Sequence, residues 1–121
     1  MLRPMKRTAR ERKPLVRLCR EELKTPPMSE EARIEAGDLL RDLQEGRSIG
    51  MPKARPMPSI GVRCLELRVN SKEGQWRVFC RVDPGRVVLI HLLEKKTEAT
   101  PPQVIALCKQ RLAAYDKARK G

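Results

Sequence analysis

Three strand-like segments follow one another in the second half of the chain, and only short turns separate them. They are RCLELRVN at residues 63–70, QWRVFCRV at residues 75–82 and RVVLIHLLEK at residues 86–95. Apolar and polar residues alternate in the first two, whereas the third is apolar on both faces for most of its length, which indicates a central strand. The SKEG and DPG sequences between them are typical of tight turns that join antiparallel strands. Because successive side chains of a strand point to opposite faces, the pattern predicts a small antiparallel sheet.

A helix is expected before these strands. Ser29 can cap its N-terminus, and the two glutamates that follow suit the positive end of a helix dipole. Gly46 ends the helix as a C′ residue, where glycine accommodates a left-handed conformation. Between these ends, apolar residues recur at helical spacing. They are Ala32, Ala36, Leu39, Leu40 and Leu43.

A second helix is expected after the strands. We predict Thr100 as its N-cap, Pro101 at its first position and Gln103 as the partner in a capping box. Apolar residues again recur at helical spacing. They are Val104, Ile105, Cys108, Leu112 and Tyr115.

These elements predict an α+β fold, a small antiparallel sheet with helices packed on one face. The apolar side of the first two strands would be buried under a helix, and the other side would be left open. A short strand around Leu15–Cys19 and an irregular, proline-rich loop at residues 47–61 complete the pattern. We expect residues 1–13 to form a basic, flexible arm and residues 14–121 to form a single domain.

The net charge of +12 restricts the partners of such a domain. It favours polyanions, with nucleic acid first and a membrane surface second. No stretch of the sequence approaches the roughly 20 apolar residues that cross a bilayer, and the basic start lacks the apolar core of a secretion signal. We therefore expect a cytoplasmic protein without a membrane partner.

The cysteines are scattered along the chain and contain no CxxC pair. They are Cys19, Cys64, Cys80 and Cys108. Zinc sites are usually built from closely spaced ligand pairs, so we expect neither a metal nor another cofactor. We expect the cysteines to be reduced and to fill the core as small apolar residues.

Cations gather on the face of the predicted sheet opposite its apolar side. Arg68 comes from the first strand, Arg77 and Arg81 from the second, and His91 from the third. These groups would repel one another without an anionic partner, which indicates a phosphate site, although neighbouring glutamates could also pair with them. The Lys95–Lys96 pair at the end of the third strand also has a functional and a structural interpretation. The two lysines could contact a phosphate, or they could form a charged strand end that prevents edge pairing.

Several short motifs can be read together in their order along the chain. They are Glu66-Leu67-Arg68, Trp76-Arg77-Val78, the run from Ile90 to Thr97, Thr100-Pro101, and Arg111-Leu112 with Tyr115. Residues 14–116 thereby resemble the RelE-like ribonuclease toxins of type II toxin–antitoxin modules. Within that group they resemble the HigB-like branch, often described as phage-derived host-killing-like proteins. Two aromatic residues usual in this branch are replaced here by Leu93 and Cys80.

The resemblance implies a toxin that cleaves mRNA in the ribosomal A site without a metal. It also implies a small antitoxin, which we expect to carry a helix-turn-helix DNA-binding domain.

In metal-free RNA cleavage the neighbouring 2′-hydroxyl is the nucleophile. We expect Arg68 and Arg77 to stabilise the phosphorane-like charge and His91 to act as general acid. Lys95 or Lys96 would neutralise the phosphate or act as base. Further RNA contacts are expected from Lys53, Arg55, Arg63, Arg81 and Arg111.

A second hypothesis is a non-catalytic RNA- or ribosome-binding module on the same fold. The replacement of aromatic residues by Leu93 and Cys80 favours it, because bases have fewer rings on which to stack. A DNA-binding regulator is not favoured, since no helix-turn-helix with a basic recognition helix is visible.

Overall fold

The computed structural model describes residues 11–19 and 28–120. Within these residues, five strands form one sheet in the order β1-β5-β4-β3-β2. The strands are β1 (Leu15–Arg17), β2 (Ala54–Pro56), β3 (Cys64–Ser71), β4 (Gly74–Val82) and β5 (Val87–Glu94), and the helices are α2 (Glu30–Gln44) and α3 (Pro102–Lys120). β1 runs parallel to β5, whereas all other neighbours are antiparallel. The predicted α+β class and its three consecutive antiparallel strands are confirmed.

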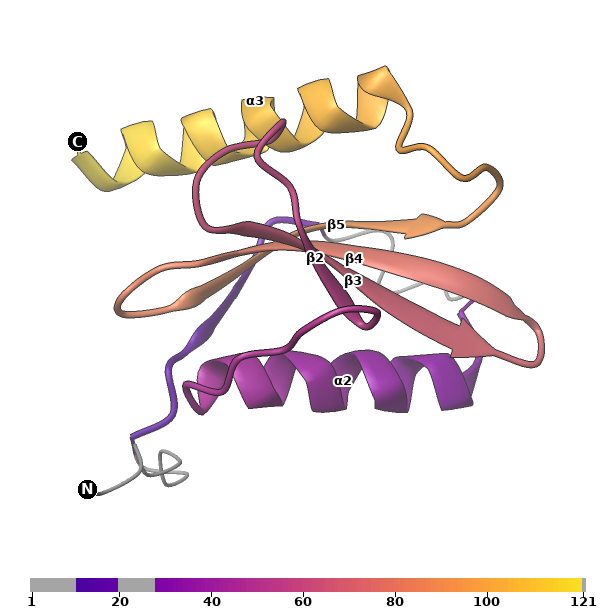
Figure 1. Cartoon of the computed structure of the whole chain (residues 1–121). Coiled ribbons are helices and arrows are strands. Elements are labelled where there is room, and N and C mark those ends of the chain that lie inside the picture. The colour runs from indigo at the N-terminus through magenta and orange to yellow at the C-terminus, as the bar shows by residue number, and fades with distance from the viewer. Residues whose placement is uncertain (1–10, 20–27, 121) are drawn as a thin grey trace.

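The sheet lies between the two helices, with α2 on one face and α3 on the other (Figure 1). The expectation that the helices pack on one face is therefore wrong. The reason lies in β4 and β5, where Phe79, Val88 and Ile90 are fully buried on the face that α3 covers. Leaving each of these side chains in water would cost about 1.5–3 kcal/mol, so this face cannot stay open along its whole length.

Each helix buries an apolar stripe against its own face of the sheet. The predicted stripe of α2 packs on alternate residues of β3 and β4, among them Leu67 and Val78. The stripe of α3 is shorter and consists of Val104, Cys108 and Leu112. All four cysteines are buried, as predicted, and burial raises the pKa of Cys80 and of Cys108 to about 12.

The predicted ends of α2 are confirmed. Ser29 is the N-cap, and its hydroxyl oxygen accepts a hydrogen bond from the backbone N–H of Ala32 at 3.1 Å. Gly46 adopts a φ of 83°, in the left-handed region. Its N–H and that of the next residue donate to carbonyl oxygens of the last helical turn, which is the hydrogen-bond pattern of a Schellman motif.

We expect Ser29→Ala to lower the free energy of unfolding by about 1 kcal/mol, because the substitution removes the acceptor for the Ala32 N–H. Urea denaturation measures the change. Ser48→Ala is a matched control at an exposed loop position and should stay within about 0.5 kcal/mol of the wild type. An equal loss in both variants would contradict the capping role.

α3 begins one residue later than predicted. Its first residue is Pro102, and the carbonyl of Pro101 accepts a hydrogen bond from the N–H of Ile105 at 3.3 Å. The predicted N-cap at Thr100 and its capping box are therefore wrong, although the helix itself is confirmed. The Thr100 hydroxyl donates to Glu66 at 3.0 Å instead. The buried carboxylate of Glu66 needs hydrogen-bond donors, whereas the N–H groups at the solvated start of α3 can find acceptors in water.

The loop at residues 47–61 contains a strand that the sequence pattern does not reveal. β2 has only three residues, too few for an alternation to be recognised, and it ends at Pro56. Proline is tolerated there because β2 is the last strand of the sheet and pairs only with β3.

Most of the predicted N-terminal arm lies outside the described residues, which begin at residue 11. The described end of this segment contacts the domain, since the Lys13 N–H donates to Gln44 O at 2.9 Å and the Lys13 ammonium donates to Asp83 O at 3.1 Å. Neither helix in the described part of the chain is long and apolar enough to cross a membrane.

Candidate functional site

Glu66 of β3 is fully buried, on the face of the sheet that α3 covers. The Thr100 hydroxyl donates to its carboxylate, and three guanidinium groups surround it. Arg68 Nε and Arg77 Nη1 each lie 3.4 Å from a carboxylate oxygen, and Arg55 Nε lies 3.6 Å away. A buried carboxylate without such partners would cost several kcal/mol, so these contacts explain how Glu66 is accommodated in the interior.

The sheet register brings these arginines together, and we call Arg55, Arg68 and Arg77 with Glu66 the arginine cluster. Arg55 of β2 is directly opposite Glu66, and Arg68 of β3 is directly opposite Arg77 of β4. Like charges directly opposite one another are destabilising. Three positive charges and one negative charge leave the cluster at +2, so a further anion would stabilise it.

The contacts to Glu66 are long compared with those of a second arginine network in the chain. The guanidinium nitrogens of Arg81 lie 2.8–3.0 Å from the carboxylates of Asp83 and Asp116. In the arginine cluster, by contrast, one carboxylate serves three guanidinium groups at 3.4–3.6 Å. Because a guanidinium carries five N–H donors, the arginines of the cluster retain donors for another oxyanion.

The arginine cluster borders a cavity of about 280 Å³ at one end of the sheet, which we call the basic cavity. Four of its lining residues are basic, namely Lys53, Arg68, Arg77 and Lys95, and one, Glu35 of α2, is acidic. Neutral lining residues include Trp76, which also belongs to the core under α2. The excess of cations suits a phosphate-bearing ligand, and the volume is near the lower end for small-molecule pockets, about 300 Å³.

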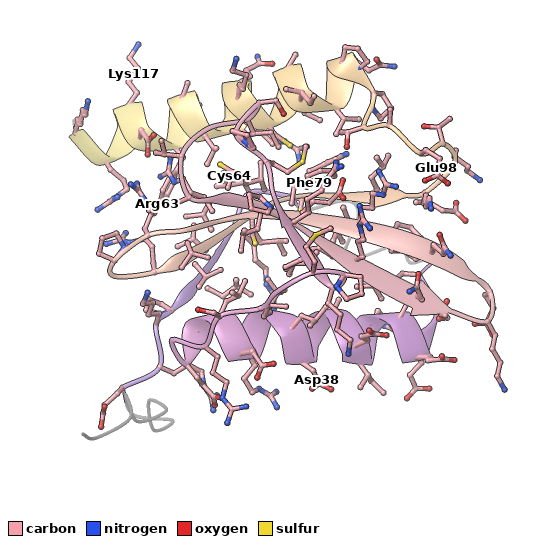
Figure 2. The ribbon with its side chains drawn as sticks, viewed as in Figure 1. Asp38, Arg63, Cys64, Phe79, Glu98 and Lys117 are labelled. Atoms are coloured by element: carbon pink, nitrogen blue, oxygen red, sulfur yellow. The ribbon has the colours of Figure 1, made fainter. Side chains whose placement is uncertain are left out.

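Lys95 stands at the edge of the basic cavity, one residue beyond β5, where its backbone N–H donates to Gln75 O at 2.8 Å. Its ammonium lies 3.3 Å from a carboxylate oxygen of Glu98, an almost fully exposed residue at this end of the molecule (Figure 2). Because Glu98 is so exposed, its contact with Lys95 contributes little, and an incoming phosphate can replace it.

A smaller hollow of about 100 Å³ adjoins the basic cavity and shares Arg77 and Lys95 with it. Lys96 lines this second hollow, and its ammonium lies 3.3 Å from Glu94. Arg77 and Lys95 therefore separate two hollows, and an anion bound between them would contact both side chains.

His91 lines neither hollow. It stacks on the buried Phe79 ring at a centroid distance of 6.3 Å, and Arg111 Nη1 lies 3.2 Å from its Nδ1. Since a guanidinium can only donate, Nδ1 is the acceptor in this contact. The same Arg111 nitrogen donates to Ile90 O at 2.8 Å, so Arg111 joins α3 to β5.

Arg63 and Arg81 belong to the opposite end of the sheet. Figure 2 shows Arg63 at the end far from Glu98, and its guanidinium lies 3.3 Å from Asp83. Arg81 is almost completely buried and joins β4 to α3 through Asp116.

The structure therefore brings together five of the predicted site residues and separates four from them. Lys53, Arg55, Arg68, Arg77 and Lys95 lie at the basic cavity or its arginine cluster, Lys96 lines the adjoining hollow, and Arg63, Arg81, His91 and Arg111 lie elsewhere.

The Arg81–Asp116 contact predicts a pH-dependent contribution to stability. Hydrogen bonding to Arg81 lowers the pKa of Asp116 below its ordinary value. A lowered pKa in the folded state stabilises the fold above the ordinary carboxyl pKa of about 3.9, and this stabilisation is lost as the pH falls through the folded-state pKa. Because Asp116 is partly exposed, we expect Asp116→Asn to cost only about 1 kcal/mol at pH 6 and less at pH 3.

Urea denaturation of the wild type and of Asp116→Asn at the two pH values tests this expectation. Asp38→Asn is a suitable control, because Asp38 is exposed on the side of α2 away from the sheet (Figure 2). A loss for Asp116→Asn that is equal at both pH values would show that the ion pair does not titrate as described.

Sequence reasoning considered Glu66 only as a possible partner of the arginines and Thr100 only as a helix cap, and it assigned no role to Glu35. The sequence does place Glu66 on the same face of its strand as Arg68, two residues away, which is a signal for an internal ion pair. No comparable signal marks Thr100 or Glu35, because they reach this region from helix and loop segments distant in sequence. Among the described residues, no group of three or more His, Cys, Asp or Glu side chains could hold a metal ion.

An open, mostly antiparallel sheet between two helices, with basic residues around one end, is consistent with a RelE-like fold. Residues 21–113 match the family model described as Phage derived protein Gp49-like (DUF891). The match covers more than half of the chain, so the protein belongs to the Gp49-like family of phage-derived proteins. Searches of curated proteins and of solved structures found no match.

Proposed function

We propose that this protein is the toxin of a type II toxin–antitoxin module and that it cleaves mRNA at the ribosomal A site without a metal. The observation that carries the proposal is the convergence of Lys53, Arg68, Arg77 and Lys95 on the basic cavity. Membership of the Gp49-like family, which resembles the RelE- and HigB-like toxins, supports it. A small antitoxin, mRNA and the ribosome are the partners that this proposal includes.

The proposed reaction is attack of the 2′-hydroxyl oxygen on the adjacent phosphorus. The new O2′–P bond replaces the P–O5′ bond, which leaves a 2′,3′-cyclic phosphate and a 5′-hydroxyl. In the transition state, charge accumulates on the non-bridging phosphate oxygens. Arg68 and Arg77 suit these oxygens, because a guanidinium donates two parallel hydrogen bonds to a phosphate.

Two protons must move in this reaction, one from the 2′-hydroxyl and one to the leaving 5′-oxygen. Glu35 supplies the only carboxylate among the residues that line the basic cavity and is the candidate acceptor. Lys95 lines both hollows, and its ammonium is the candidate donor. His91 is less suitable, because its Nδ1 faces a guanidinium and the ring lies outside both hollows.

The position of His91 also favours a second candidate function, a module that binds RNA or the ribosome without cutting it. The basic cavity then keeps its affinity for phosphate but lacks a histidine for proton transfer. The two functions differ in one measurable outcome, the appearance of new RNA ends.

The test uses a translated reporter mRNA in a cell-free system, with cleavage sites mapped by primer extension, in the presence and absence of ribosomes. We compare the wild type with a Lys53→Ala, Lys95→Ala variant, which removes two charges from the basic cavity. The control is Lys109→Ala, Lys117→Ala, which removes the same charge from exposed positions of α3, where Lys117 points away from the sheet (Figure 2).

We expect the wild type and the control to cut at codon-phased positions only when ribosomes are present. Cutting by the cavity variant should fall by about 10- to 100-fold, because the removed charges stabilise the phosphate in the transition state. Equal cutting by both double variants would contradict the proposed site. Uncut mRNA, with ribosome co-sedimentation that only the cavity variant loses, would establish the binding module instead.

A further inference from the structure

The carboxylate of Glu66 divides its contacts between its two oxygens. Oε1 faces Arg68 and Arg55, at 3.4 Å and 3.6 Å. Oε2 faces Arg77 at 3.4 Å and accepts the hydrogen bond from Thr100 at 3.0 Å. The shortest contact is thus the one to the neutral hydroxyl. Thr100 therefore fixes the carboxylate, and the carboxylate in turn contacts each of the arginines that line the basic cavity.

Thr100 also connects the arginine cluster to the segment between the end of β5 and the start of α3, which carries Lys95 and Lys96. This segment is held at both ends. The Lys95 N–H is bonded to Gln75 O at 2.8 Å, and the Thr100 hydroxyl is bonded to Glu66. A single buried carboxylate thereby contacts both arginines of the basic cavity and anchors the segment that presents Lys95.

We infer that Glu66 is a positioning residue for phosphate recognition at the basic cavity. Its buried carboxylate orients the guanidinium groups of Arg68 and Arg77, is itself oriented by Thr100, and leaves the remaining guanidinium N–H groups to the phosphate. The inference rests on the proposed function for its effect on RNA cleavage. Its effect on the arginines themselves does not depend on whether RNA is cut.

A positioning role differs from a purely structural role in its effect on binding. Glu66→Gln keeps the shape of the side chain but raises the charge of the arginine cluster from +2 to +3, since three cations then remain without a carboxylate. The attraction for RNA in the ground state should therefore not fall. Cleavage should fall, because loosely oriented guanidinium groups no longer meet the transition-state oxygens.

We expect Glu66→Gln to slow cleavage of the reporter mRNA by about 10- to 100-fold, while its dissociation constant for a short RNA stays within about 3-fold of the wild type or decreases. Glu66→Asp retains the charge, but its shorter side chain moves the carboxylate away from the arginines. Cleavage by this variant should also be slower than that of the wild type. Cleavage by Glu66→Gln at the wild-type rate would overturn the inference, as would parallel losses of binding and cleavage in a variant that unfolds at the wild-type temperature.

A second pair of variants leaves the buried charge in place, in case Glu66 variants do not fold. Thr100→Val removes the donor to Glu66 and keeps the shape, whereas Thr100→Ser keeps the donor. We expect slower cleavage by Thr100→Val, by about 3- to 10-fold, and near wild-type cleavage by Thr100→Ser. Equal rates in the two variants would overturn the role of this hydrogen bond.

The arginine Nε–H signals in a ¹⁵N–¹H NMR spectrum test the inference without any activity. Arg68 donates through Nε to Glu66, and Arg81 donates through Nε to Asp83 and serves as an internal reference. We expect Glu66→Gln and Thr100→Val to shift or broaden the Arg68 signal, assigned with Arg68→Lys, and to leave the Arg81 signal unchanged. An unchanged Arg68 signal overturns the inference. If the wild type cuts no RNA but the Arg68 signal changes in the two variants as expected, only the proposed function is overturned.

Discussion

Replacing Arg77 by lysine should lower the rate of mRNA cleavage by about 10²- to 10³-fold, the largest effect that we expect from a single substitution in the basic cavity. Arg77 is almost completely buried, contacts Glu66 and lines both hollows. Lysine keeps the positive charge that Glu66 needs but offers a single donor group in place of the planar fork. The rate is measured from the accumulation of cleaved reporter mRNA in the cell-free system.

Arg47→Lys is the matched control for this substitution, because Arg47 is exposed and does not line the basic cavity. Thermal unfolding of both variants separates a loss of chemistry from a loss of fold. If Arg77→Lys unfolds at the wild-type temperature and cuts mRNA as fast as Arg47→Lys, charge alone is sufficient at this position. The proposed bidentate contact with phosphate would then be wrong.

Replacing Phe79 by alanine should have the largest effect on stability, a loss of about 3–5 kcal/mol in the free energy of unfolding. The Phe79 ring is fully buried in the core between the sheet and α3 (Figure 2). It also stacks on His91. Since small domains are stable by only about 5–15 kcal/mol, this loss removes a large part of the total stability. Urea denaturation followed by circular dichroism measures the loss.

Ile34→Ala is the control for Phe79→Ala, since Ile34 on α2 is largely exposed although it is apolar. We expect this control to stay within about 0.5 kcal/mol of the wild type. A loss below about 1 kcal/mol for Phe79→Ala would mean that α3 does not seal this face of the sheet in solution. The face would then be open along its length, as the strand pattern alone had suggested.

The candidate site was only partly predictable. Arg68 and Arg77 share a face because of strand alternation, and a hairpin of known register places them opposite each other. His91 lies on the same face but further from the end of the sheet, stacked on the ring of Phe79. Alternation specifies the face of a side chain but not whether a helix covers it. The separation of His91 from the lysines could therefore not be read from the pattern.

The sequence by itself determined the three antiparallel strands, both ends of α2 and the existence of α3. Each of these depends on interactions between residues close in the chain, such as turn chemistry, the Ser29 cap and the Gly46 Schellman motif. Only the tertiary structure decided the side of the sheet that α3 covers, the pairing of β2 and the burial of Glu66. The physical reason is that a buried charge is tolerated only beside its partners. For Glu66 these include Arg77 and Thr100, which are 11 and 34 residues away in the sequence and meet it only when the domain is folded.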